Sequence, residues 1–254
     1  MVALTINYAL ANPATSVEKG PIGDFVGGLL NPILTFLTFI GLLVSIWFQR
    51  KELRLSKKEL QRSADALEQQ VAYTDKQSFE ATFFQMLAML GSVVDSIDLV
   101  NKGSGNVTAG KDCFRVFYTR LNKSYREQVK KAGGKYTLRE SLELAYKIYW
   151  RDAGLELGHY YRVLFNIFTF LENSKNSQPY HAKILRAQLS DAELLLLFYN
   201  CLTKSGKPFT ELAVKYQLFD NMPTVRLLED EHINYIDRKA FGDNPLTTSK
   251  TARS

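Results

Sequence analysis

The stretch FVGGLLNPILTFLTFIGLLVSIWF, from Phe25 to Phe48, decides the fold class of this chain. It runs for twenty-four residues without a charge, and a helix needs only about 20 apolar residues to cross the hydrocarbon core of a bilayer. A cleaved signal peptide would begin with basic residues and a shorter apolar run near Met1. Here the basic residues follow the apolar stretch instead. The sequence therefore predicts a transmembrane helix over residues 25–48.

Basic residues are distributed unequally around this stretch. Lys19 is the one basic residue before it, whereas six follow within thirteen positions: Arg50, Lys51, Arg54, Lys57, Lys58 and Arg62. Flanks rich in Lys and Arg stay in the cytoplasm. We therefore expect a single-pass protein with residues 1–24 outside the cytoplasm and the C-terminal domain inside it. Trp47 supports this frame, because an amphipathic ring prefers the headgroup layer.

The polar residues of the stretch share one helical face. They are Asn31, Thr35, Thr38 and Ser45, with Gly27 and Gln49 on the same line. Small and hydroxylated residues allow close approach and hydrogen bonding between membrane helices, so this face predicts a seam between copies or a pore lining. The alternative is that Thr and Ser bond carbonyls of their own helix while Asn31 and Pro32 only bend it.

Residues 49–76 form the next segment, which is rich in Leu, Lys, Glu and Gln. Leu53, Leu60 and Leu67 recur every seven residues, which is typical of a coiled coil. Lys57 lies on the same line and weakens that pattern. The segment is therefore either a short coiled coil or a basic helical stalk that packs on its own domain.

Residues 77–246 keep the spacing of amphipathic helices, with no convincing alternation of strands, so we predict an all-α helical bundle. Residues 101–110 contain Gly, Ser and Asn and predict a loop. Ser190 and Glu193 have the spacing of a capping box before the buried run LLLLFY. The last residues, 247–254, predict a disordered tail.

The sequence argues against a metal site or a disulfide framework. Cys113 and Cys201 are far apart, and the histidines His159, His181 and His232 lack the i,i+4 pairing of helical zinc sites. The net charge of +6 is spread along the chain and is densest beside the apolar stretch. We therefore expect contact with membrane lipid, no cofactor and no sequence-specific binding of nucleic acid.

Several polar residues stand inside apolar helical runs: His159, Tyr160, Arg162, Arg186, Gln188 and Glu193. Buried charge needs a partner, so we expect a network of Arg with Glu or Gln. The network either pins two helices together or forms a trigger pocket whose occupancy changes their packing.

Arg226 and His232 form an R-x5-H arrangement, which is loosely similar to the motif of HEPN ribonucleases. Its specificity is poor, because such short spacings arise by accident. A ribonuclease with these two catalytic residues is the second hypothesis for function.

Four stretches carry a resemblance to a known family. They are GDFVGGLLNPILTFLTFIGLL running into WFQRKELRLSKKEL, FEATFFQML from Phe79, LGHYYRVLFNIFTFLE from Leu157, and YHAKILRAQLSDAELLLLFYN from Tyr180. Together they resemble the phage abortive-infection family often called AbiC-like, which includes transmembrane effectors of some retron defence systems. Members of that family often carry two membrane helices, whereas this sequence has one that is long enough.

The resemblance implies a toxic effector of antiphage defence in the bacterial inner membrane. It implies a protein that is held inactive by a sensing or neutralising partner, such as a retron reverse transcriptase–RNA/DNA complex. Together with the polar face, it implies a homo-oligomer that perturbs the membrane. It transfers no catalytic residue to this chain.

Overall fold

The computed structural model describes residues 20–100, 103 and 105–245. The predicted tail at 247–254 and most of the predicted N-terminal segment lie outside these residues. The chain divides into two compact units, Met1–Ala72 and Tyr73–Ser254. The second unit begins at Tyr73, whereas the sequence predicted the start of the helical domain at residue 77.

The described part of the first unit, residues 20–72, lies on one helix. Helix α2 (Gly20–Asp95) contains the whole apolar stretch and the predicted stalk, and Pro32 lies inside it. Among the described residues, α2 is the one helix long and apolar enough to cross a membrane. Between Gly23 and Ala72, every residue except Gly27 is exposed. The apolar stretch is therefore not a core helix of a soluble domain.

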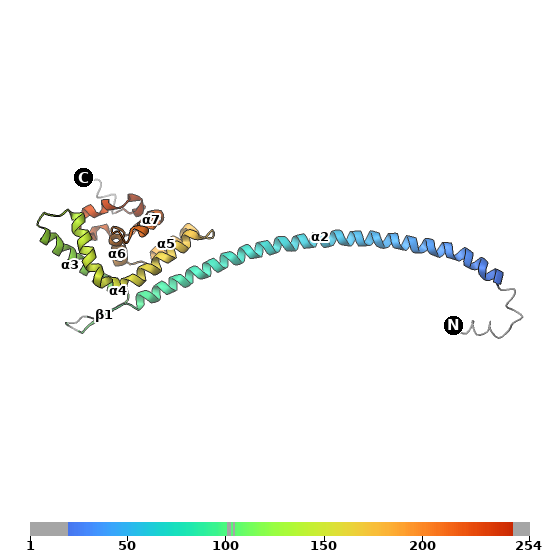
Figure 1. Cartoon of the computed structure of the whole chain (residues 1–254), viewed down its shortest axis with the longest axis horizontal. Helices are drawn as coiled ribbons and strands as arrows, with labels where there is room; N and C mark the ends of the chain where they lie inside the picture. Colours follow the sequence, from blue (N-terminus) through green and yellow to red (C-terminus); the bar gives the residue numbers. More distant parts are fainter. Residues whose placement is uncertain (1–19, 101–102, 104, 246–254) are drawn as a thin grey trace. The chain divides into compact units, whose positions relative to one another are not determined.

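The second unit is built almost entirely of helices, which confirms the predicted all-α class (Figure 1). The end of α2 is followed by α3 (Asp112–Ala132), α4 (Leu138–Asn173), α5 (Pro179–Ala187), α6 (Asp191–Cys201) and α7 (Lys207–Tyr216). Three short 3-10 helices complete it: η1 (Thr224–Arg226), η2 (Asp230–Tyr235) and η3 (Arg238–Phe241).

A small antiparallel hairpin interrupts the helices where the sequence predicted only a loop. Strand β1 (Asp98–Val100) pairs with β2 (Val107–Ala109), and Asp98 faces Ala109. Each strand has three residues, which is too short for a pattern of alternating side chains to be recognised. The hairpin connects α2 to α3 and does not change the fold class.

Helix α6 is the innermost helix of the second unit. All nine of its residues from Glu193 to Cys201 are buried, so the run LLLLFY has no solvent face. Ser190 and Glu193 form the predicted capping box, in which the Ser190 hydroxyl accepts the Glu193 amide and the Glu193 side chain accepts the Ser190 amide. This cap satisfies backbone donors at a helix end that would otherwise be buried without partners.

Candidate functional site

The polar face of α2 satisfies part of its hydrogen bonding within its own helix. The hydroxyl of Thr35 donates to the Asn31 carbonyl at 2.8 Å, and that of Thr38 donates to the Leu34 carbonyl at 2.8 Å. The amide of Gln49 donates to the Ser45 hydroxyl at 3.3 Å. The two threonine bonds fit the alternative interpretation, in which the hydroxyls bond carbonyls of their own helix. Both threonine oxygens still keep a lone pair that can accept a hydrogen bond from another helix.

Tyr160 and Glu193 meet in the core of the second unit, between α4 and α6. The Tyr160 hydroxyl donates to Glu193 Oε1 at 3.0 Å, and Glu193 Oε2 accepts the Ser190 amide at 2.8 Å and the Ser190 hydroxyl at 2.6 Å. Burial raises the pKa of Tyr160 well above its usual value, and the Glu193 carboxyl adds to this effect. The pair joins two helices and keeps the phenol protonated.

Arg186 lies elsewhere and binds the end of α7. Its guanidinium donates to the carbonyls of Gln217 at 2.6 Å and Tyr216 at 3.3 Å, and it lies 3.6 Å from the Asp220 carboxyl. A cation at the C-terminus of a helix complements the free carbonyls and the helix dipole there. Arg186 therefore fixes the turn after α7 to α5.

The predicted network of Arg with Glu or Gln is therefore wrong in its pairing. Glu193 binds Tyr160 and Ser190, whereas Arg186 binds Asp220 and backbone. The expectation of burial is also wrong for three residues, because His159, Arg162 and Gln188 are exposed. On α4, the buried side is defined by Leu157, Tyr160, Tyr161 and Leu164, and the helical period turns His159 and Arg162 away from it.

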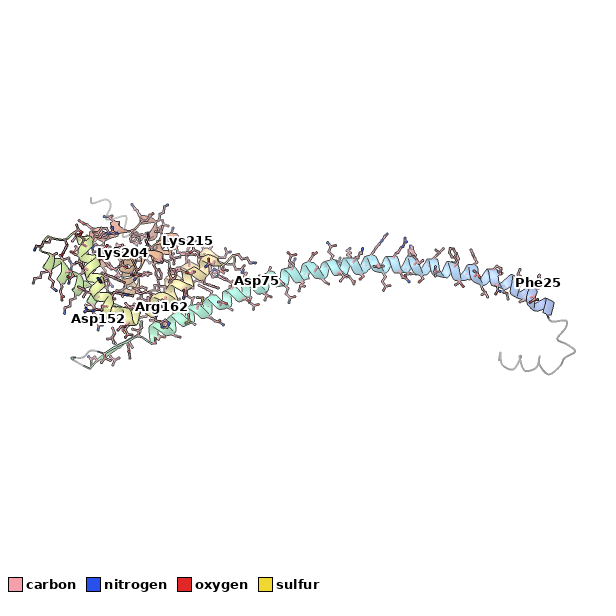
Figure 2. The ribbon with its side chains drawn as sticks, in the orientation of Figure 1. Phe25, Asp75, Asp152, Arg162, Lys204 and Lys215 are labelled. Carbon is pink, nitrogen blue, oxygen red and sulfur yellow. The ribbon has the colours of Figure 1, made fainter. Side chains whose placement is uncertain are left out.

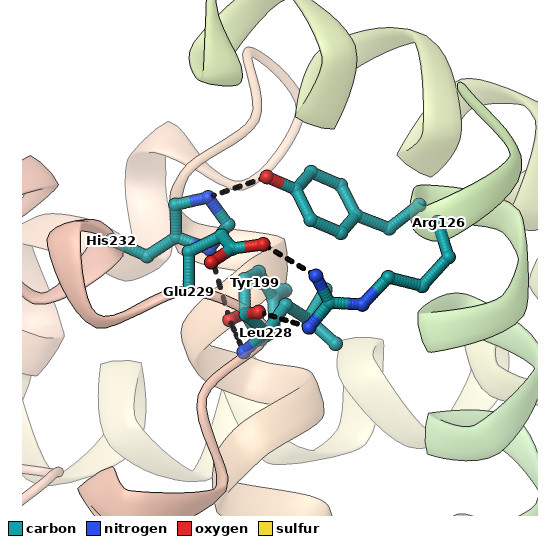
Figure 3. Close-up of polar contacts among 6 residues, drawn as sticks. Arg126, Tyr199, Leu228, Glu229 and His232 are labelled. Atoms are coloured by element: carbon teal, nitrogen blue, oxygen red, sulfur yellow. Dashed lines mark hydrogen bonds and ion pairs between the residues drawn. The ribbon is translucent and has the colours of Figure 1, made fainter. Parts of the chain in front are cut away.

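A second buried polar cluster surrounds His232 (Figure 3). His232 is fully buried, with Nδ1 lying 3.1 Å from the Tyr199 hydroxyl and Nε2 lying 3.5 Å from the Tyr125 hydroxyl. The Tyr199 oxygen accepts the Leu228 amide at 2.6 Å, so its own proton is available to Nδ1. This assigns the imidazole proton to Nε2.

The electrostatics of this cluster favour a neutral imidazole. Burial lowers the pKa of His232 to about 4, which outweighs the opposing effect of the Glu229 carboxyl. The guanidinium of Arg126 binds both Glu229 and the Leu228 carbonyl, the latter at 2.7 Å. Arg126 thereby offsets the Glu229 carboxylate, which would favour imidazolium.

Arg226 does not share the environment of His232. Its side chain is 65% exposed and lies 3.7 Å from the Asp191 carboxyl, whereas its backbone carbonyl accepts the Tyr118 hydroxyl. The two residues of the R-x5-H arrangement are thus divided between the surface and the core. Their catalytic role stays a prediction, and the ring nitrogens of His232 already have tyrosine partners.

A cavity of about 710 Å³ lies beside α4 and the α6–α7 loop. Trp150, Tyr146 and Leu144 give it an apolar wall, and Lys147, Lys204 and Asn200 are among its polar groups. A few polar groups on an apolar wall are the usual composition of a ligand pocket. The full lining is Tyr136, Glu140, Glu143, Leu144, Tyr146, Lys147, Trp150, Asn200, Thr203, Lys204 and Ser205.

Sequence reasoning missed this cavity, because its residues come from two distant segments and form no motif. One local signal is Gly206, where a Cβ atom would lie 1.9 Å from the Asn200 carbonyl oxygen. The loop can therefore close against Asn200 only with glycine at this position. Asn200 in turn donates to the Tyr146 hydroxyl at 2.9 Å, which links the loop to α4.

Within the described ranges, no group of three His, Cys, Asp or Glu side chains is placed to hold a metal ion. Cys113 and Cys201 are both buried free thiols. Burial raises the pKa of each thiol, so neither has the character of a reactive nucleophile.

Comparison with protein families matches part of the second unit. Residues 155–227 match the model of a family described as "Putative phage abortive infection protein". Over these residues the chain is similar to the phage abortive-infection family. This match confirms the predicted resemblance and indicates a role in phage abortive infection. No curated protein and no solved structure is significantly similar to this chain.

The matched segment, residues 155–227, contributes part of the core of the second unit. It includes Tyr160, Glu193 and Arg186, the part of α4 from Leu155 onward, helices α5, α6 and α7, and the α6–α7 loop beside the cavity. The apolar stretch of α2 and His232 lie outside it. The residues that join α4, α5, α6 and α7 are therefore the part of the molecule with a recognised relationship.

Proposed function

We propose that this protein is a membrane-anchored toxic effector of phage abortive infection, which damages the inner membrane of its own host when phage is sensed. One observation carries the proposal. The chain that holds the abortive-infection segment also holds a twenty-four-residue stretch without charge, and the apolar side chains of this stretch are exposed on α2. An exposed apolar stretch of this length is stable only in contact with lipid or with another membrane helix.

The basic flank supports a cytoplasmic position for the second unit, within reach of a sensor. Six Lys and Arg residues between Arg50 and Arg62 resist translocation. A toxin that acts on its own host must be restrained in the uninfected cell. We therefore propose that a sensing partner, such as a retron reverse transcriptase–RNA/DNA complex, holds the second unit inactive until infection.

The ribonuclease hypothesis ranks second because of the state of His232. A catalytic base or acid must reach the substrate, whereas this imidazole is fully buried and both nitrogens face tyrosine hydroxyls. Arg226 lies at the surface in an ion pair with Asp191. Cleavage of RNA by these residues would first require the cluster to open.

The order of events after induction separates the two hypotheses. The full chain is expressed from an inducible promoter, and membrane potential and RNA integrity are followed in the same culture. We expect the potential to collapse while RNA is intact, and we expect His232→Gln to kill at the parental rate. RNA loss that precedes depolarisation, together with a folded but harmless His232→Gln variant, would assign the toxicity to the ribonuclease.

A further inference from the structure

The polar face in the membrane stretch and the leucines of the stalk lie on one line along α2. We propose that a second copy of this chain packs in parallel along this line, from Asn31 to Val71, as one continuous interface. The inference rests on the proposed membrane-anchored function, since the membrane fixes the orientation of both copies. We name the line the α2 ladder: Asn31, Thr35, Thr38, Leu42, Ser45, Gln49, Leu53, Lys57, Leu60, Ala64, Leu67 and Val71.

The continuity of α2 is what makes this one surface. The helix is unbroken from Gly20 to Asp95, so the angular relation between the membrane stretch and the stalk is fixed. The ladder advances by alternating steps of three and four residues, except for successive steps of four from Ser45 to Lys57. Its mean step is about 3.6 residues, which is the period of a straight α-helix. The successive steps of four between Ser45 and Lys57 therefore keep the ladder residues of the membrane stretch and those of the stalk on the same side of the helix.

Nothing within the described part of the chain covers this surface. Leu53, Leu60 and Leu67 are 59%, 67% and 60% exposed, and Figure 2 shows side chains of α2 standing free around the helix. The stalk contains the basic flank and lies in water, where a single helix with a row of exposed leucines is only marginally stable. A partner must therefore cover the ladder.

The chemistry of the ladder suits an identical helix. Because membrane insertion gives both copies the same direction, every ladder residue faces its own counterpart. In a parallel pair, the residues that flank the α2 ladder bring no like charges together. Ser56 of one copy lies opposite Gln61 of the other, and Ser63 lies opposite Glu68. Leucines pack against leucines in the stalk.

The polar members of the ladder are compatible with this packing. Thr35 and Thr38 already bond carbonyls of their own helix, so the interface buries no unsatisfied hydroxyl proton there. Asn31 and Lys57 are the two members that resist burial. A polar residue at such a position lowers stability but favours one register over shifted ones, so the two residues would align the copies.

Cysteine cross-linking of the full chain in native membranes tests the interface. Two positions on the ladder, Thr38→Cys and Leu67→Cys, are each compared with a control two residues on, Ile40→Cys and Gln69→Cys, which lies about 200° around the helix. The unsubstituted chain gives the background, because Cys113 and Cys201 are buried. We expect several-fold more disulfide-linked dimer at both ladder positions than at their controls. Equal yields at ladder and control, no dimer, or a product with a chain of different mass would overturn the proposal.

An insertion tests whether the interface is continuous. Alanines are inserted between Lys51 and Glu52 in each ladder variant: seven residues turn a helix by about two full turns, and nine by about two and a half. With seven alanines both cross-links should persist, whereas with nine at least one should be lost. Two cross-links that survive nine alanines would show two independent interfaces and refute the single ladder. The cross-linking pattern does not depend on toxicity, so loss of depolarisation alone would contradict only the proposed function.

Discussion

At the scale of single residues, His232 links the buried cluster to pH. Its pKa in the folded protein is about 4, against about 6.5 for a histidine in an unfolded chain. Between these values the unfolded chain binds the proton and the folded chain does not, so stability rises with pH in this window. The contribution of His232 is therefore complete above pH 6.5 and is lost as the pH falls toward 4.

This effect can be measured on the full chain in detergent. From pH 7 to pH 4, His232 should lower the free energy of unfolding by about 3 kcal/mol. Denaturant unfolding at several pH values gives the slope of the free energy of unfolding against pH. His232→Gln should remove the contribution of His232 to this slope, whereas the contribution of the carboxyl groups should remain. An identical slope in both proteins would mean that His232 is not buried as a neutral base.

Arg186 and Arg162 form a matched pair for testing burial. Arg186 holds Asp220 and two carbonyls and its side chain is 11% exposed. Arg186→Ala should therefore destabilise the protein by about 3 to 5 kcal/mol, toward the lower end because Asp220 is 26% exposed. Arg162→Ala should change stability by less than about 0.5 kcal/mol, because Arg162 lies at the surface.

Thermal or chemical unfolding of the two variants decides this prediction, with toxicity measured beside it. An Arg186→Ala protein that unfolds like the parent but no longer kills would contradict the structural role. It would instead support the trigger-pocket hypothesis for this residue.

At the scale of helices, the polar face of α2 distinguishes an active segment from an anchor. An anchor needs only apolar length, whereas each hydrogen bond between membrane helices adds about 0.6 kcal/mol of association. Replacing Thr35, Thr38 and Ser45 together with leucine keeps the stretch apolar. The triple variant should still insert, but it should lose self-association and toxicity.

Membrane fractionation, cross-linking at Leu67→Cys and killing curves measure these three properties. A matched control replaces Thr82, which is exposed on the part of α2 within the second unit and bonds the Ser78 carbonyl in the same way. Thr82→Leu should leave all three properties unchanged. A triple variant that inserts and kills like the parent would reduce the stretch to a tether.

What the sequence could predict about these elements depended on how local the interactions are. The capping box of Ser190 and Glu193 lies within four residues, and its pattern indicated the start of α6 correctly. The partners of Arg186 lie thirty residues later, at Tyr216 and Gln217, so no pattern around Arg186 could identify them. The aromatic residues on both sides of α4 concealed its period, which is why His159 and Arg162 were expected inside.

At the scale of the whole molecule, the distribution of basic residues predicts the topology. A reporter that is active only in the cytoplasm, fused after Ser254, should be active, because the six basic residues from Arg50 to Arg62 resist transfer across the membrane. Replacing all six with glutamine should reduce this activity and raise that of a periplasmic reporter at the same position.

The same fusions connect topology to mechanism. A sensing partner in the cytoplasm can restrain the second unit only if that unit faces it, and the abortive-infection segment lies wholly within this unit. A periplasmic reporter that is active after Ser254 in the parent protein would place the segment beyond the reach of a cytoplasmic sensor. The anchor would then still hold the protein in the membrane, but the release step would have to depend on a signal from outside the cytoplasm.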